Sequence, residues 1–215
     1  MSLMPPLPDC RLCSRWELAP KNPGVPTIQV GIPGRDALVV VAPSPGYYEH
    51  VHNEPAVGKP GRLLREILLA ELSTLCTIYL TYLVRCGVDQ DSKSKDFKSC
   101  FTHHLADIHS IWASPAPQIR VLLLGADATT QFHRLHLGIR VSHKDAIANN
   151  GKPRTILSRS VPVFATIHPA AILRNNSLIH TVEDHINLLT AHVKGQAPTP
   201  TDPDIQAPRS PHHLP

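Results

Sequence analysis

The 215-residue sequence is poor in aromatic residues, at 5%, and has no apolar run long enough to span a membrane. Its first residues lack the basic start and apolar stretch of a secretory signal. Charged residues are only 18% of the chain, whereas hydrophobic residues reach 42%. This composition argues against a disordered chain and predicts a globular protein with no membrane partner, located in the cytoplasm.

The expected domain covers residues 1–194. Residues 195–215 hold six prolines and little that is apolar, so we expect a disordered Pro-rich tail there. The net charge of +4 and the pI near 8.9 allow nucleic acid as a partner without requiring it. We expect a monomer.

Four cysteines have the arrangement of a metal site. Cys10 and Cys13 form a C-x2-C pair, and Cys86 and Cys100 follow far downstream. Four thiolates suit a tetrahedral zinc site or an iron–sulfur cluster, and the alternative is four unrelated core cysteines. The fifth, Cys76, has apolar neighbours and is expected in the core. This spacing in a chain without a secretory signal favours a reducing compartment.

Apolar runs alternate with segments of helical periodicity. The predicted strands are residues 36–41, 77–84, 118–124 and 161–167, and the predicted helices are 61–72, 100–112, a segment starting near Asp127, and 181–193. This alternation predicts an α/β fold, a three-layer α/β/α sandwich around a mostly parallel four-stranded sheet. In such sheets the ligand lies beyond the carboxyl ends of the strands.

The unusual residues gather at those expected strand ends. In order they are C-R-L-C at 10–13, A-P-S-P-G at 42–46, N-E-P-A-V-G-K-P-G-R-L-L at 53–64, Y-L-T-Y-L-V-R-C at 79–86, L-G at 124–125 and H-P-A-A-I-L-R at 168–174. Over roughly residues 8–192 this set resembles the uracil-DNA glycosylase superfamily, in particular its family 4. The resemblance implies a DNA glycosylase with a 4Fe–4S cluster on Cys10, Cys13, Cys86 and Cys100.

Three positions depart from the pattern of that family. Pro43 stands where the family has an acidic residue that activates water, Ala56 where it has a Phe that stacks on uracil, and Tyr82 where it has the Asn that reads the uracil edge. A flipped base needs a platform and hydrogen bonds to its edge. We therefore expect poor activity on uracil and a pocket, formed with Ser44 and Gly46, that admits a larger base.

Tyr82 can supply a new stacking face or a hydroxyl contact, or it can be a core tyrosine near the cluster. Glu49 and His50 are candidates for the general base, unless they lie on a solvated loop or no strong base is needed. His168 is expected to donate a hydrogen bond to the leaving base as negative charge develops there.

Basic residues near these motifs are candidates for phosphate contacts: Lys59, Arg62, Arg85 and Arg174, with Lys144, Lys152 and Arg154. The polar residues 138–160 are expected to form a long connection that could act as a wedge or lid.

The favoured hypothesis is a monofunctional glycosylase that excises a bulky modified base and leaves an abasic site. Glucosylated hydroxymethylcytosine in phage DNA is the best candidate, which would make the activity an antiviral defence. The alternatives are a conventional uracil-DNA glycosylase of base excision repair, a catalytically inactive iron–sulfur protein that binds DNA, and a plain zinc protein.

Overall fold

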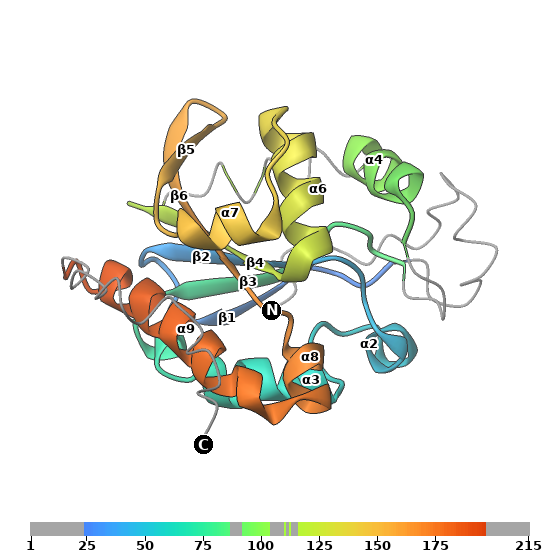
Figure 1. Ribbon diagram of the computed structural model, residues 1–215, viewed down its shortest axis with the longest axis horizontal. Helices are drawn as coiled ribbons and strands as arrows, with labels where there is room; N and C mark the ends of the chain where they lie inside the picture. Colours follow the sequence, from blue (N-terminus) through green and yellow to red (C-terminus); the bar gives the residue numbers. More distant parts are fainter. Residues whose placement is uncertain (1–23, 87–91, 104–109, 111, 113–115, 197–215) are drawn as a thin grey trace, which may run out of the picture.

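A six-stranded sheet organises the protein (Figure 1). The structure is a computed structural model that describes residues 24–86, 92–103, 110, 112 and 116–196. The strand order is β1-β3-β2-β4-β6-β5. The strands are β1 (Ile28–Gly31), β2 (Ala37–Ala42), β3 (Thr77–Tyr82), β4 (Ile119–Leu124), β5 (Pro153–Ile156) and β6 (Arg159–Thr166).

The four inner strands are the four that the sequence predicts, and they are parallel to one another. The expected count of four is wrong for the whole sheet, because β1 and β5 add antiparallel edges. Both edge strands are only four residues long and largely solvent-accessible, so neither carries the continuous apolar run of a buried strand. The mostly parallel sheet itself is confirmed.

Helices cover both faces of the sheet and complete the expected three layers (Figure 1). One face carries α4 (Ser94–His103), α6 (Gly125–Leu137) and α7 (His143–Ala148). The other carries α3 (Lys59–Leu63), the π-helical turn η1 (Leu64–Leu68), the 3₁₀ turn η2 (Leu72–Thr74), α8 (Pro169–Arg174), the 3₁₀ turn η3 (Asn176–Leu178) and α9 (Ile179–Val193). Helix α2 (Tyr47–His52) lies beside the sheet edge.

The central strands alternate between two cores. Val39 and Val41 of β2 belong to the core under α6, whereas Leu38 and Val40 belong to the core under α3 and α9. Successive residues of a strand point to opposite faces, so a strand covered on both sides is apolar throughout. This explains why β2 and β4 read as unbroken apolar runs and were recognisable in the sequence.

The helix expected over residues 61–72 is not continuous. The Leu69 N–H bonds to the Leu64 carbonyl at 2.8 Å, five residues back, so the helix widens into the π-helical turn η1. At its start, a Cβ on Gly61 would lie 2.3 Å from the Ala56 Cα. Glycine therefore allows this helix to pack directly on the backbone of the preceding loop.

Two stretches expected to be irregular are structured. Residues 47–52 form α2, and residues 138–160 contain α7 and β5. Ser142 caps α7 by accepting a hydrogen bond from the Asp145 N–H at 3.1 Å. The expected wedge or lid is therefore a short helix followed by a β-hairpin. Helix α4 also begins at Ser94, six residues before the predicted start.

Cys76 is 1% exposed, as expected for a core residue, and burial raises the pKa of its thiol to about 11. Within the described ranges, no helix is both long and apolar enough to cross a bilayer. The expected tail beyond residue 196, and Cys10 and Cys13, lie outside the described residues.

Candidate active site

Several of the predicted site residues lie at the carboxyl edge of the parallel strands. Residues 42–46 follow β2, Tyr82 ends β3, Gly125 follows β4, and His168 follows β6 after one residue. The connection after β2 leads to α3 on one face, whereas the connection after β4 leads to α6 on the other (Figure 1). Such a reversal opens a crevice at the strand ends, where ligands of α/β sheets bind.

His168 is held at the N-terminus of α8 in a defined tautomer. Its Nδ1 accepts a hydrogen bond from the Ala170 N–H at 3.2 Å. Nδ1 is therefore unprotonated and Nε2 carries the proton. Burial lowers the pKa of His168, the Arg174 charge lowers it further, and the Glu49 charge opposes both. The imidazole is consequently neutral near pH 7, with Nε2–H as its donor.

Gly125 allows the close approach of β4 to His168. Its φ of +84° lies in the region that favours glycine, and a Cβ there would lie 3.0 Å from the His168 Cβ. Any side chain at this position would press on the Cβ atom that carries the His168 ring. The glycine therefore helps to set where the ring lies.

Glu49 is buried on α2, at 7% exposure, and does not lie on a solvated loop. The Gly58 N–H donates to its Oε1 at 2.8 Å, and a Cβ on Gly46 would lie 2.8 Å from its Oε2. The Glu49 charge affects the pKa of both Tyr82 and His168 in the upward direction. The structure therefore brings this carboxylate to the same edge as those two side chains.

His50 follows Glu49 on the same helix and is half-buried. Adjacent residues of an α-helix point about 100° apart, so the two side chains leave α2 in different directions. Besides Glu49, the other buried carboxylate of the described residues is Asp96, which accepts a hydrogen bond from the Lys93 N–H at the start of α4. Of the two candidate bases, Glu49 and His50, Glu49 is thus the better placed.

Tyr82 and Ala56 are in direct contact. The Ala56 N–H donates to the Tyr82 hydroxyl oxygen at 3.1 Å, and Ala56 is 6% exposed with a left-handed φ of 57°. The space expected to be open beside Ala56 therefore holds the end of the Tyr82 side chain. Burial, with the Glu49 charge, raises the pKa of Tyr82 well above its usual value, so the phenol stays protonated and can donate.

The backbone of the 42–46 loop is tied to the chain that follows β3. The Leu83 N–H donates to the Ala42 carbonyl, and the Val84 N–H to the Pro43 carbonyl, both at 3.0 Å. Ser44 is half-buried and Gly46 is exposed at the start of α2. These bonds hold the loop that carries Pro43 next to Tyr82.

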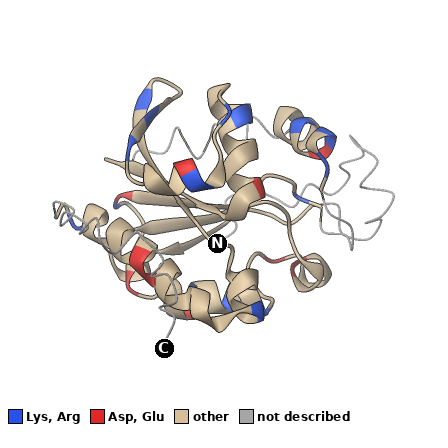
Figure 2. Ribbon diagram, viewed as in Figure 1, with Lys and Arg blue, Asp and Glu red and all other residues tan. Residues whose placement is uncertain are grey.

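The basic residues separate into two groups. Lys59, Arg62 and Arg174 are exposed, and Figure 2 marks the basic residues of α3 in blue. Arg85 is 3% exposed, so its prediction as a surface phosphate contact is wrong. Its position directly before Cys86 places it in the interior near the end of β3.

The described half of the cysteine set is compatible with a thiolate-bound metal. Cys86 and Cys100 are both buried. The start of β1 lies beside the end of β3 because the two strands are antiparallel, and the Val25 N–H donates to the Arg85 carbonyl at 2.9 Å. The chain thus arrives beside Cys86 twelve residues after Cys13, and twelve residues can span roughly 40 Å.

Cys10 and Cys13 lie outside the described residues, and among the residues that the structure does describe there is no cluster of three or more metal-ligating side chains. The two buried thiols, Cys86 after the end of β3 and Cys100 on α4, are two of the four donors that an iron–sulfur cluster needs.

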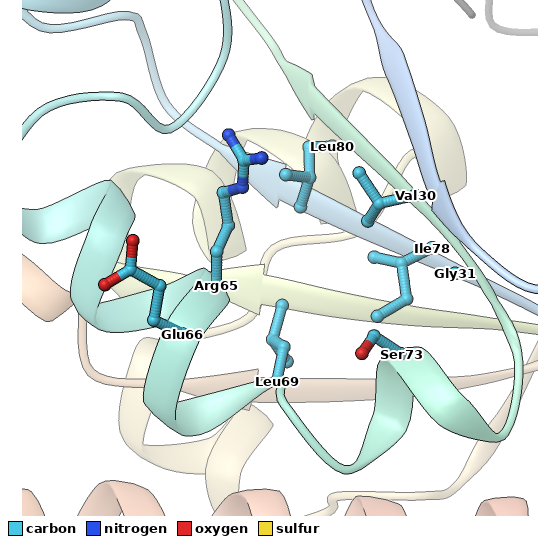
Figure 3. Close-up of a pocket in the computed structure, with 8 residues that line it drawn as sticks. All are labelled: Val30, Gly31, Arg65, Glu66, Leu69, Ser73, Ile78 and Leu80. Carbon is cyan, nitrogen blue, oxygen red and sulfur yellow. The ribbon is translucent and has the colours of Figure 1, made fainter.

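A groove of about 320 Å³ lies away from this edge, between β1 and the η1 turn. Figure 3 shows its apolar floor, which includes Val30, Leu69 and Ile78, with Arg65 and Glu66 at the rim. None of the predicted site residues lines it. The candidate site is therefore identified by its chemistry rather than by the size of a hollow.

Sequence reasoning missed one supporting residue, Gly58, and the backbone conformation of a predicted one, Ala56. Gly58, which binds the Glu49 carboxylate, was visible only as part of a motif, and the left-handed backbone of Ala56 had no signal because alanine rarely adopts it. Helix α2 was missed because six residues are too few to show a helical period.

Comparison with known proteins supports the resemblance. Residues 30–191 match the family model of the Uracil DNA glycosylase superfamily. The chain is also similar to the Type-4 uracil-DNA glycosylase of Saccharolobus solfataricus, with 24% identity over 183 residues, which cover 81% of this chain and 77% of that protein.

Proposed function

The chain belongs to the uracil DNA glycosylase superfamily, and on this premise we propose that it is a monofunctional DNA glycosylase for a base bulkier than uracil. The proposal is carried by the replacement of both uracil-reading positions of the family pattern, with Tyr82 in place of its Asn and Ala56 in place of its Phe. This altered pair lies at the same edge as a neutral His168 and a buried Glu49.

The proposed reaction adds water across the N-glycosidic bond of an extruded nucleotide. As the C1′–N bond breaks, negative charge develops on the base and positive charge on the sugar. His168 donates its Nε2–H hydrogen bond to the leaving base, as a neutral imidazole can without giving up its proton. The water oxygen binds C1′, and its proton passes to solvent or the base.

Glu49 is the proposed partner of the water and of the sugar cation. Its carboxylate is buried, anchored by Gly58, and it acts on the same space as His168. The reaction is proposed as monofunctional, with water as the nucleophile and no lysine assigned to attack the sugar. Bifunctional glycosylases need an amine nucleophile to form a Schiff base.

Base selection is assigned to Tyr82, with Ser44 and Gly46 contributing to the pocket. Because the Tyr82 hydroxyl holds the Ala56 amide, a large base enters only when this side chain rotates away. Its ring then offers a stacking face and its hydroxyl a donor. The proposed substrate is glucosylated hydroxymethylcytosine in phage DNA, so the protein would act in antiviral defence in the cytoplasm, as a monomer.

A 4Fe–4S cluster is proposed on Cys10, Cys13, Cys86 and Cys100, with exposed Lys59, Arg62 and Arg174 contacting DNA phosphates. When bound, the cluster would supply a rigid covalent link between the N-terminal segment, the end of β3 and α4.

A conventional uracil-DNA glycosylase is the second candidate. It is favoured by the position of the Tyr82 hydroxyl, which takes the space beside Ala56 and leaves less room for a larger base. The similar protein from Saccharolobus solfataricus bears that name.

The test is release of base from matched oligonucleotides that contain uracil, hypoxanthine or glucosylated hydroxymethylcytosine, read by alkaline cleavage at abasic sites. Cleavage of the glucosylated strand with little at uracil supports the proposal. Cleavage at uracil alone contradicts it and supports the second candidate. DNA binding without release from any strand would indicate an inactive iron–sulfur protein.

A further inference from the structure

The outer face of α2 is unusually apolar for a surface helix. Tyr47 is 62% exposed, Tyr48 56% and Val51 48%, while Glu49 on the same helix points inward. The whole chain has only four tyrosines, and two of them stand side by side in solvent here. Contiguous exposed apolar side chains of this kind mark interaction sites more often than chance.

The two rings form a corner rather than a flat surface. Their centroids are 5.6 Å apart and their planes meet at 82°. A continuous stack of paired bases is flat and parallel, so it can use only one of two perpendicular faces. Bases of a single strand can turn independently, and each ring can then take one base by its face.

The surroundings of α2 suit a polyanion. Helix α3, joined to α2 through the bond from Gly58 to Glu49, exposes Lys59 and Arg62. Figure 2 shows basic residues on α3 and none on α2. The nearest exposed acid in sequence, Glu54, is paired with Arg65 at 3.3 Å. Aromatic faces for bases beside cations for phosphates are the pattern of single-strand binding.

We propose that Tyr47 and Tyr48 form a stacking platform for unpaired bases next to the extruded nucleotide, so that the enzyme binds single-stranded or locally melted DNA. This inference rests on the proposed function, since α2 also carries Glu49. A base held on the outer face of α2 lies one helix width from the carboxylate on its inner face. The platform therefore holds the neighbours of the nucleotide that enters the site.

The test is equilibrium binding of a labelled single-stranded oligonucleotide and of its duplex, both without modified bases, measured by fluorescence anisotropy. The double variant Y47A/Y48A is expected to bind the single strand at least about tenfold more weakly. Its duplex affinity is expected to stay within about twofold. Y47F/Y48F keeps both ring faces and is expected to bind like the wild type.

Two further variants separate stacking from charge. Ile67→Ala removes an equally exposed apolar side chain elsewhere, 60% exposed on η1, and is expected to change nothing. Arg62→Gln is expected to reduce the slope of log binding constant against log salt concentration by somewhat less than one. Y47A/Y48A is expected to leave that slope unchanged. Circular dichroism and melting temperature confirm that each variant is folded.

Unchanged single-strand affinity of Y47A/Y48A, or an equal loss for single strand and duplex, overturns the platform while leaving the glycosylase proposal intact. If the wild-type protein binds neither DNA, the proposed function itself fails.

Discussion

The two ends of the sheet differ in how fully their buried and half-buried polar side chains are hydrogen-bonded. At the amino end, the Arg120 guanidinium donates to Asp36 at 2.8 Å, to Gln118 at 2.6 Å, and to His192 through Nδ1 at 2.9 Å and the carbonyl at 3.1 Å. At the carboxyl end, no contact in the described part of the chain gives an acceptor to the Nε2–H of His168 or the hydroxyl proton of Tyr82.

This difference distinguishes a scaffold from a site. A buried charge that makes four hydrogen bonds within the protein stabilises the fold and has little left to offer a ligand. A polar group that is withdrawn from solvent and has an unbonded donor lowers the stability of the fold, and such groups are concentrated at active sites. Arg120 ties the starts of β2 and β4 to the end of α9, whereas His168 and Tyr82 are held by one bond each.

Removing the hydrogen bonds of Arg120 at the amino end of the sheet should have the largest effect on stability. Arg120→Met removes all four bonds and leaves Asp36 and His192 without their partner, so we expect a loss of about 3 kcal/mol in the free energy of unfolding. Urea denaturation measures it, with Arg140→Met, at an exposed arginine, as the control. A loss below about 1 kcal/mol would show that this network is not structural.

At the carboxyl end of the sheet, substitution of His168 is expected to lower mainly the rate of base release. His168→Asn keeps a side chain that can cap α8 but lacks the Nε2–H donor, whereas His168→Ala lacks both. We expect both variants to cleave the preferred substrate about 100- to 1000-fold more slowly. Only His168→Ala should also lose about 1 kcal/mol of stability. Single-turnover cleavage and urea melts separate the two roles, and an active His168→Asn would contradict the donor assignment.

Gly125→Ala tests how closely the scaffold approaches the site. The new Cβ would have an unfavourable φ and would press on His168, so we expect a loss of about 1–2 kcal/mol and a slower reaction. Gly34→Ala is the matched control, because Gly34 has a φ of +80° and no atom within 4 Å of the added Cβ. Equal cleavage rates in the two variants would mean that contact with His168 is unimportant.

Acidic pH should lower the free energy of unfolding through histidines at both ends of the sheet. Burial lowers the pKa of His168 at the carboxyl end and of His192 at the amino end, and the same holds for His133 and His185. The unfolded chain therefore binds more protons, so stability is complete above about pH 6.5 and falls as the pH drops below it.

Urea denaturation between pH 7.5 and 5 measures this loss. His168→Asn should show a shallower decline than the wild type, whereas His52→Gln, at an exposed histidine, should not. A free energy of unfolding that rises on acidification would contradict the assignment of these lowered pKa values.

Several features of the site could be predicted from the sequence because they depend on short motifs. His168 before a proline and Gly125 at the end of an apolar run identified two members of the site. For Arg85 and Tyr82, the burial and the bonding partner could not be predicted in this way. The first proved to be buried, and the second bonds to a residue 26 positions away. The burial and the partner of a side chain depend on how distant segments meet, which a local pattern does not encode.

The sequence by itself determined the four parallel strands, the closing helix and the edge at which the unusual residues meet. Hydrophobic periodicity is local, and a strand buried on both faces must be apolar throughout. Only the tertiary structure decided that Glu49 is inside and that Tyr47 and Tyr48 are outside. It also decided that Tyr82 reaches Ala56 and that two short strands extend the sheet. Those outcomes depend on packing between segments far apart in the chain, where a few ångströms separate a core residue from a ligand-binding one.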